Sequence, residues 1–311
     1  MKRIAPIFIL IAVVCIAALV LQSCKEEVVD FDANNCKGNT AFIQKMGFDG
    51  QSSFFTTTDQ KIMGLVLKQS EQPGNPNARI VKSFQHPSWK KGGWLAPILI
   101  DEGGNIFTSP APFINILDNP ISNNNTIYRV DAASGEMQEF MHLPLQDSIN
   151  PQNPYGIIGM VYLCETNTLY VSSVAGSRLH QENGHIYAID IKNKKIIDQL
   201  DHVDAMGMGI SYGAGKRQLF FGTGRSSDVQ VITLDASGKF SGKPQTTFTL
   251  QNLGPRGDDK VRRIKTDNNG NLLVYGIEFN FNLIAPREKQ EMLYRFIYDE
   301  SEKQWIYQQN P

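Results

Sequence analysis

Several carboxylates of this chain stand in polar segments rich in glycine and proline, where binding loops commonly form. They are Asp204, Asp258, Asp259 and Glu278. Two opposed carboxylates at a fixed separation can hydrolyse a glycosidic bond, and a group of hard oxygen ligands can hold Ca²⁺. The sequence does not set the distances between these groups, and it contains no serine-type or cysteine-type nucleophile motif. We therefore assign no catalytic residue and no required cofactor, with Ca²⁺ as the ion that such ligands would bind.

The same kind of segment also carries aromatic, histidine and arginine side chains. Such groups bind sugars or peptides by stacking and by paired hydrogen bonds. We predict that they form one ligand-binding surface with the carboxylates. Its further members are Trp89, Trp94, Tyr155, His202, Arg225 and Arg256. The alternative is that proline and glycine only shape these loops, while tryptophan caps the hydrophobic ends of the elements that the loops connect.

The elements that must position these loops form a repeat. Five β-prone runs, each opened by a turn of Gly, Asn, Asp or Thr, lie at residues 53–57, 105–109, 168–172, 218–222 and 271–275. Each is followed by a second run, and in four units that run ends in an aspartate and a turn. These aspartates are Asp131, Asp190, Asp235 and Asp299. Gly, Asn and Asp tolerate the positive φ of hairpin turns, so each unit is predicted to form antiparallel strands.

Each unit also has a first and a last strand. The first strands are predicted at 41–46, 95–100, 157–163, 208–212 and 261–265, and the last at 79–84, 137–143, 195–200, 245–250 and 304–308. The third strand of the first unit is predicted at 62–66, and no convincing helical period follows residue 30. Four antiparallel strands in radial repetition form the blade of a β-propeller, whose exposed face the next blade covers. The fold class is therefore all-β: one propeller over residues 36–311 with five blades, or six if a divergent blade lies in a long link. Other all-β sandwiches or solenoids are the alternative.

The N-terminal residues have the pattern of an export signal. Lys2 and Arg3 precede an apolar run over residues 4–21. Residues 21–24, Leu-Gln-Ser-Cys, resemble the bacterial lipobox, although Gln is unusual at its position. This resemblance implies that a signal peptide, 1–23, is removed and that Cys24 is acylated, so that lipid chains anchor the protein in a membrane. An uncleaved transmembrane helix is the alternative.

Two further short segments are similar to sequences of Bacteroidota lipoproteins. Lys25-Glu26-Glu27 resembles their surface-export signal, which implies an outer-membrane lipoprotein on the periplasmic or cell-surface face. The alternative is a solvated charge run in a lipidated tether, 24–35. Asp147-Ser148-Ile149 resembles their O-glycosylation sequence, which makes Ser148 a candidate acceptor. Three matching residues also arise by chance.

Composition limits the other functions. The chain has 311 residues, of which 41% are hydrophobic, so it is not a disordered chain. Its 30 basic and 31 acidic residues give a net charge of −1, and we expect no nucleic-acid partner, because phosphate binding requires a basic excess. Four cysteines are too few for a disulfide framework. With Cys15 in the signal and Cys24 lipidated, Cys36 and Cys164 remain. They could pair, or Cys164 is a small buried residue.

The sequence pattern of the repeats resembles that of a known superfamily of propellers. Turns such as Asn269-Gly270-Asn271-Leu272 and strands such as Ile186-Tyr187 ending in Asp190 are similar to the NHL, YVTN and gluconolactonase-like propellers. This resemblance implies the fold and ligand binding at one mouth of a central channel, and it implies the activity poorly. We expect a binding or scaffolding module for a glycan, a peptide or a partner protein. The alternative is a metal-dependent hydrolase or lactonase of the gluconolactonase type.

Overall fold

The computed structural model describes residues 38–59, 61–75, 78–111, 118–145, 153–212, 216–267, 269–279 and 290–309. The predicted signal and lipidation site, Cys24, and the candidate glycosylation site, Ser148, lie outside these residues. The described residues belong to the unit Phe31–Pro311. No helix among them is both long and apolar enough to cross a membrane.

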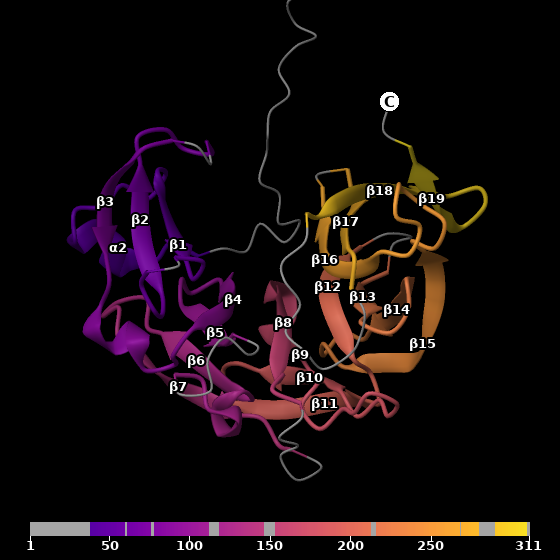
Figure 1. Ribbon diagram of the computed structural model, residues 1–311, viewed down its shortest axis with the longest axis horizontal. Helices are drawn as coiled ribbons and strands as arrows, with labels where there is room; N and C mark the ends of the chain where they lie inside the picture. Colours follow the sequence, from indigo (N-terminus) through magenta and orange to yellow (C-terminus); the bar gives the residue numbers. More distant parts are fainter. Residues whose placement is uncertain are drawn as a thin grey trace, which may run out of the picture. The chain divides into compact units, whose positions relative to one another are not determined.

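The described chain is a five-bladed β-propeller whose blades are antiparallel sheets. Blades 2 to 5 each have four strands, and blade 1 has three (Figure 1). The strands are, in blade 1, β1 (Ser53–Thr56), β2 (Val66–Ser70) and β3 (Ile80–Phe84); in blade 2, β4 (Leu95–Ile100), β5 (Ile106–Pro110), β6 (Thr126–Val130) and β7 (Met137–His142); in blade 3, β8 (Ile157–Leu163), β9 (Thr168–Ser173), β10 (His185–Asp190) and β11 (Lys195–Asp201); in blade 4, β12 (Ala205–Ser211), β13 (Gln218–Thr223), β14 (Asp228–Leu234) and β15 (Phe240–Thr249); and in blade 5, β16 (Lys260–Thr266), β17 (Leu272–Ile277), β18 (Met292–Asp299) and β19 (Gln304–Gln308). The predicted fold class is confirmed, with five blades.

Two predicted strands of blade 1 are wrong. Residues 41–46, predicted as its first strand, contain a short helix, α2 (Ala41–Lys45), which Gly47 ends in a left-handed conformation with φ of 70°. The third strand, predicted at 62–66, begins only at Val66, because Gly64 has a φ of 94° that a strand does not accommodate. Blade 1 therefore lacks a counterpart of the first strand of the other blades. Three short 3-10 helices complete the elements: η1 (Pro87–Lys90), η2 (Ile121–Asn123) and η3 (Cys164–Thr166).

The recurring aspartates of the repeat close the turns between the last two strands of blades 2 to 5. The carboxylate of Asp131 accepts hydrogen bonds from the backbone N–H groups of Ala133 and Ser134, and that of Asp235 accepts from Ser237 and Lys239. Asp190 and Asp299 do the same in their blades. These bonds satisfy backbone donors within the turn and lower the pKa of each carboxyl group.

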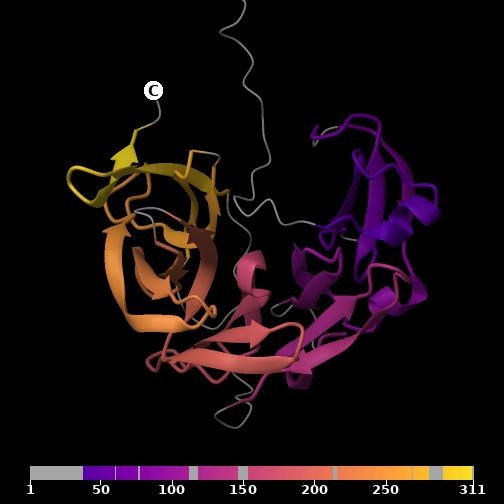
Figure 2. The same cartoon turned by 180° about the vertical axis from the view of Figure 1, so that it is seen from behind.

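Four hydrophobic cores join consecutive blades. The core between blades 1 and 2 surrounds Trp89, whose ring is fully buried and whose Nε1–H donates to the carbonyl oxygen of Gly135 at 2.8 Å. The other three cores lie between blades 2 and 3, 3 and 4, and 4 and 5. Figure 2 shows the sheets from behind. None of the core clusters formed by the described residues joins blade 5 to blade 1.

The first strands of blades 2 to 5 follow one another along the chain of blades, with β8 beside β4 and β12, and β12 beside β16. Each of these four strands has a register shift near its first residues. In β12 the shift lies at Gly207, where a Cβ atom would come within 2.7 Å of the backbone nitrogen of Arg263. The glycine thus allows blades 4 and 5 to approach closely. A register shift of this kind bends the strand, here just after the loops that carry the predicted site residues.

Candidate functional site

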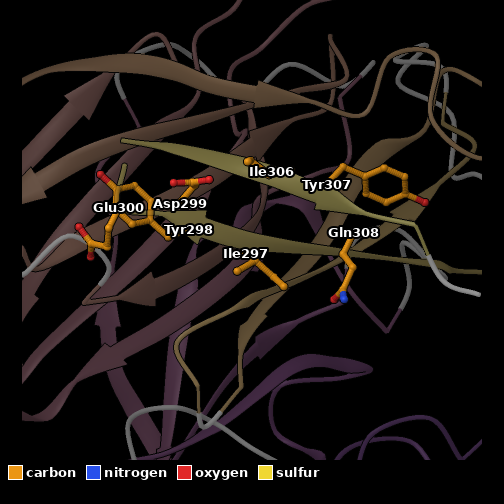
Figure 3. A pocket seen from close by; sticks show the side chains of 7 residues that line it. All are labelled: Ile297, Tyr298, Asp299, Glu300, Ile306, Tyr307 and Gln308. Atoms are coloured by element: carbon orange, nitrogen blue, oxygen red, sulfur yellow. The ribbon is translucent and has the colours of Figure 1, made fainter. Parts of the chain in front are cut away.

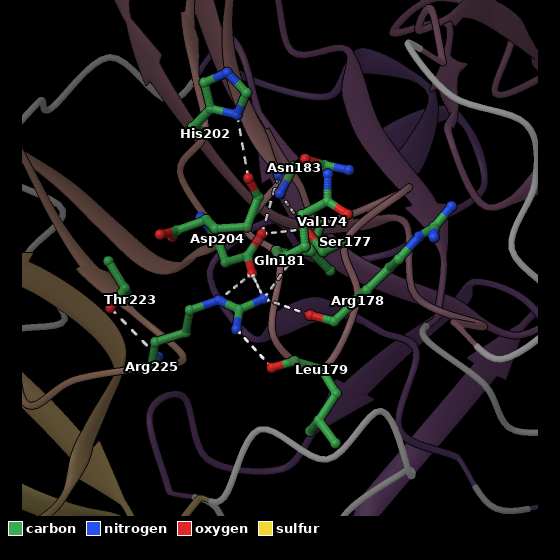
Figure 4. A network of polar contacts seen from close by, with 12 residues as sticks. Val174, Ser177, Arg178, Leu179, Gln181, Asn183, His202, Asp204, Thr223 and Arg225 are labelled. Carbon is green, nitrogen blue, oxygen red and sulfur yellow. Dashed lines mark hydrogen bonds and ion pairs between the residues drawn. The ribbon is translucent and has the colours of Figure 1, made fainter.

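The side chain of Asp204 organises the junction between blades 3 and 4 (Figure 4). It is fully buried immediately before β12. One carboxylate oxygen accepts hydrogen bonds from the Ser177 hydroxyl and, at 3.0 Å, from the N–H of Gly184. The other accepts from Nε of Arg225 at 2.7 Å. Burial raises the pKa of Asp204 above its ordinary value, against the opposing effect of Ser177 and Arg225.

Arg225 uses the rest of its guanidinium to hold a loop of blade 3. Nη1 donates to the carbonyl oxygen of Leu179 at 2.9 Å, and Nη2 donates to those of Arg178 at 2.8 Å and Gln181 at 3.1 Å. These residues belong to the link between β9 and β10, whereas Arg225 follows β13 of blade 4. A single arginine therefore fixes the loop of one blade to the next, as the dashed lines in Figure 4 show.

Glu182 and His202 bring titratable groups to the edge of this network. Glu182 is half-buried, and its Oε1 accepts from the N–H of Asp204 at 2.7 Å. Burial is the main cause that raises the pKa of Glu182, and the nearby charge of Asp204 adds to it. His202 is exposed, with a φ of 58°, and its Nδ1 donates to the carbonyl oxygen of Glu182 at 3.2 Å. A carboxyl group that keeps its proton to a higher pH can donate it to a ligand.

A second buried carboxylate, Asp259, lies in the equivalent place before β16 of blade 5. It accepts from Nε and Nη2 of Arg256 at 2.5 and 2.7 Å, and from the Tyr294 hydroxyl at 2.8 Å. Arg256 also donates to the carbonyl oxygens of Gly276 and Gln290. All of these groups belong to blade 5 or to the loop that leads into it.

The structure therefore brings the predicted site residues together in two groups. His202, Asp204 and Arg225 form one network, and Arg256 and Asp259 form the other. Asp258 and Glu278 are exposed. Sequence reasoning missed Ser177 and Glu182, for which the only signal was the unusual length of the link before residue 185.

The predicted aromatic residues lie apart from one another. Trp89 is enclosed in the core between blades 1 and 2. Trp94 is partly exposed, and its Nε1–H donates to Asp118 at 3.3 Å. Tyr155 is buried, which raises its pKa to about 12, and its hydroxyl has no hydrogen-bond partner among the described residues. Of the three, only Trp94 is more than slightly exposed to solvent.

A shallow groove lies elsewhere, at the outer hairpin of blade 5 (Figure 3). It runs along β18 and β19, and its lining combines apolar, aromatic and acidic side chains. The lining residues are Ile297, Tyr298, Asp299, Glu300, Ile306, Tyr307 and Gln308. Within the described ranges, no group of three or more His, Cys, Asp or Glu side chains is arranged to hold a metal ion.

The comparisons with known proteins support the fold alone. No family model matches the sequence, and no curated protein matches it. A crystal structure of a protein from Lactobacillus plantarum is similar over 84% of this chain and 68% of that chain, with 13% identity and a TM-score of 0.51. The calcium-binding protein regucalcin from Agrobacterium tumefaciens is similar over 84% and 71%, with 13% identity and a TM-score of 0.47.

A putative 6-phosphogluconolactonase from Bacteroides fragilis is similar over 78% of this chain and 63% of that chain. Its identity is 10% and its TM-score 0.45. At such low identity, similarity extends to the arrangement of blades and not to a ligand or a reaction.

Proposed function

We propose that this protein is a lipid-anchored binding or scaffolding module of the bacterial envelope that recognises a partner protein. The observation that carries the proposal is the distribution of exposed apolar side chains. Among the described residues, eight large hydrophobic side chains are exposed, and six of them lie on blades 1 and 5. These are Phe54, Ile80, Val81, Leu293, Ile297 and Ile306. Ile297 and Ile306 are paired across β18 and β19, and neighbouring exposed apolar side chains are typical of macromolecular interaction sites.

The buried carboxylates support binding over hydrolysis. Asp204 and Asp259 are fully buried, and each is bound to an arginine and to further donors of the protein. A general acid or a nucleophile must contact the substrate, whereas these two side chains hold the protein together. Both carboxylates are already paired with groups of the protein itself, so we favour the exposed faces of the blades as the binding surface.

Export to an oxidising compartment is supported by the chemistry of Cys164. This residue is disulfide-bonded, and its partner lies outside the described residues. Disulfides persist in exported proteins and are rare in the cytosol. A lipoprotein anchored through Cys24 would acquire such a bond after translocation.

Two experiments test the proposal. Membrane fractionation of the Cys24→Ala variant should release the protein into the soluble fraction, and retention of that variant in the outer membrane would exclude a lipid anchor. Site-specific photo-crosslinking in living cells should give defined protein adducts from a probe at Phe54 or Ile306. A probe at Ser237, in an exposed turn of blade 4, should give none. Equal labelling at all three positions would exclude a specific partner at the end blades.

The second candidate function is a hydrolase or lactonase, and one observation favours it. Glu182 combines partial burial, a raised pKa and the nearby imidazole of His202, as a proton donor to a leaving group would. Lactone hydrolysis measured with and without Ca²⁺ tests this candidate. Turnover that falls by at least about a hundredfold in Glu182→Gln, the range of a lost general acid, would support an enzyme. Turnover equal to the buffer blank would exclude one for the lactones tested.

A further inference from the structure

The disulfide-bonded Cys164 stands in a well-fixed turn of blade 3. It begins η3, between β8 and β9, and is partly buried against the core that joins blades 2 and 3. Its carbonyl oxygen accepts from the N–H of Asn167 at 3.0 Å, and the Tyr162 hydroxyl donates to Oδ1 of Asn167 at 2.9 Å. The next residue, Glu165, forms an ion pair with Arg217 of blade 4. The cysteine is therefore held in a defined position, and its partner must come to it.

The chain that precedes α2 lies along a turn of blade 2. The Thr40 hydroxyl donates to the carbonyl oxygen of Gly104 at 3.0 Å. Two residues earlier, the N–H of Gly38 donates to the carbonyl oxygen of Asp101 at 2.8 Å. Both acceptors belong to the turn between β4 and β5. A Cβ atom on Gly38 would collide with the carbonyl oxygen of Glu102, so the segment lies directly on this turn.

The same turn of blade 2 lies beside the strand that leads into Cys164. Strands β4 and β8 are neighbours. The pKa of Tyr162, near the end of β8, is raised to about 12, mainly by burial. The charges of Asp101 and Glu102 add to the rise, and a backbone hydrogen bond from Glu102 opposes it. The turn that Gly38 contacts is therefore close to the end of β8.

These contacts identify the cysteine that can reach Cys164. Cys36 stands two residues before Gly38, and Cys164 stands two residues after Tyr162. Two residues of extended chain span about 7 Å, and a disulfide joins Cα atoms that lie about 4.4–6.8 Å apart. Of the cysteines outside the described residues, Cys36 is the one whose chain neighbours are already held beside the end of β8. The other two are predicted to be removed with the signal or acylated.

We propose that Cys36 and Cys164 form a disulfide that fastens the chain preceding blade 1 to blade 3. The two thiols pass two protons and two electrons to a disulfide of an exported thiol oxidoreductase, which is reduced to a dithiol, and a sulfur–sulfur bond forms between them. The loop that this bond closes contains blade 1, blade 2 and β8. A disulfide stabilises a fold mainly by restricting the unfolded chain, and the effect grows with the length of the loop.

Blade 1 gains most from this bond. It has three strands, and among the core clusters of the described residues only the one shared with blade 2 includes it. Phe42 and Ile43 of α2 belong to that core, and the disulfide holds the chain that enters α2. Opening of the bond therefore loosens blade 1 and leaves blade 5 unchanged. The inference goes beyond the proposed function and shares with it only export, which supplies the oxidant.

The first experiment maps the bond in the full-length protein, extracted from membranes in detergent with free thiols alkylated. Cleavage after lysine and arginine places Cys36 in the peptide 26–37 and Cys164 in the peptide 130–178, and neither contains another cysteine. Mass spectrometry should find these two peptides joined, and reduction should separate them. Alkylated Cys36 and Cys164, or Cys164 joined to a peptide that carries a different cysteine, would overturn the inference.

Thermal melts measure what the bond contributes. Cys36→Ser should lower the Tm by at least about 4 °C, the low end for a lost disulfide in a domain of this size. The double variant with Cys164→Ser should melt no lower than Cys164→Ser alone, because either change already removes the bond. A reductant should lower the wild-type Tm to that of Cys36→Ser and leave this variant, the matched control, unchanged. Additive losses in the double variant would contradict the inference.

Hydrogen exchange tests the fastening of blade 1. In Cys36→Ser the amides of β1, β2 and β3 should exchange faster, whereas those of β16 to β19 should keep their wild-type rates. Equal acceleration in both blades would reject this role. If the bond is absent while Cys24→Ala still releases the protein from the membrane, the inference fails and the proposed anchor stands. A mapped bond in a protein that gives no specific adducts in cells would support the inference and reject the proposed binding function.

Discussion

Asp204 and Asp259 are the same residue type in the same place, directly before the first strand of consecutive blades, and both are fully buried. The two aspartates differ in the blades from which their hydrogen-bond partners come. Asp204 binds Ser177 and Gly184 from a loop of blade 3, and Arg225 from blade 4. Asp259 binds Arg256, three residues earlier in the chain, and Tyr294 of its own blade. One aspartate therefore cross-links two blades, and the other stabilises the entry to one.

The difference shows that a loop carboxylate cannot be given a role from its type and neighbours alone. Both aspartates stand in polar loops that are suited to ligand binding. Partners that are distant in sequence hold both carboxylates inside the fold: Ser177 is 27 residues from Asp204, and Tyr294 is 35 residues from Asp259. A buried ion pair contributes little net stability because burial opposes the attraction, yet removing one partner is costly. The two sites therefore differ most in what happens when they are broken.

The largest effect is expected for Asp204→Ala. This change leaves the Ser177 hydroxyl, the Gly184 N–H and the Arg225 guanidinium without their acceptor, at the junction of two blades. We expect a loss of about 3 kcal/mol in the free energy of unfolding, the lower end for a broken buried pair. Denaturant unfolding measures it. Asp258→Ala, at an exposed position, is the control and should stay within about 0.5 kcal/mol of the wild type.

A smaller effect is expected for Asp259→Ala. Arg256 keeps its hydrogen bonds to the carbonyl oxygens of Gly276 and Gln290, and the orphaned groups belong to a single blade. We expect a loss of about 2 kcal/mol, typical of hydrogen bonds to a charged group. Double-mutant cycles should give a larger coupling for Asp204 with Arg225 than for Asp259 with Arg256. The reverse order of the couplings would contradict the comparison.

The variant Tyr294→Phe separates the contribution of the Tyr294–Asp259 hydrogen bond to stability from that of the Arg256–Asp259 ion pair. The change removes the hydroxyl that donates to Asp259 and leaves Arg256 in place. We expect a loss of about 1 kcal/mol in unfolding free energy, close to the mean for one hydrogen bond. In the Asp259→Ala background the same change should cost almost nothing, because the acceptor is already gone. A full cost in that background would show that packing of the ring, and not the hydrogen bond, determines the effect.

The strands of blades 2 to 5 could be predicted because each blade repeats the same local signals, above all the turn aspartates. Blade 1 departs from the repeat, and there two local cues were decisive. Gly47 marks the end of a helix, and Gly64 stops a strand that the apolar residues 62–66 otherwise suggest. Both cues are readable in the sequence, but glycine also occurs in hairpin turns, so the repeat pattern by itself predicts strands on either side of these glycines.

The site could be predicted only as a set of polar loops. Asp258 and Asp259 are neighbours in sequence, yet one is exposed and the other fully buried. What separates them is the distant Tyr294 and the direction of the chain entering β16, neither of which a local pattern contains. For the same reason Glu182 was missed, because its raised pKa depends on burial against the loop that holds Asp204.

The smallest expected effect concerns the exposed turn aspartates, whose pKa values move in the direction opposite to that of Asp204. Hydrogen bonds from turn N–H groups lower the pKa of Asp235 below its ordinary value of 3.8. A carboxyl group with a lowered pKa in the folded state contributes stability above its unfolded pKa and loses it as the pH falls. Burial raises the pKa of Asp204. The contribution of this carboxyl group to stability is therefore present at low pH and is lost as the pH rises through the raised pKa.

The variant Asp235→Asn therefore tests the direction of this pH dependence, because the wild type and the variant can both form the turn. At neutral pH the variant should melt slightly below the wild type, because an amide accepts turn hydrogen bonds less strongly than a carboxylate. As the pH falls below about 4, where an ordinary aspartate becomes protonated, the difference in Tm should begin to shrink. The two Tm values should converge once the pH is below the lowered pKa of Asp235, since the wild-type carboxyl group in the folded protein then resembles the amide. Thermal melts between neutral and acid pH measure the difference. A gap in Tm that stays constant or widens on acidification would mean that the charge of Asp235 does not stabilise the turn.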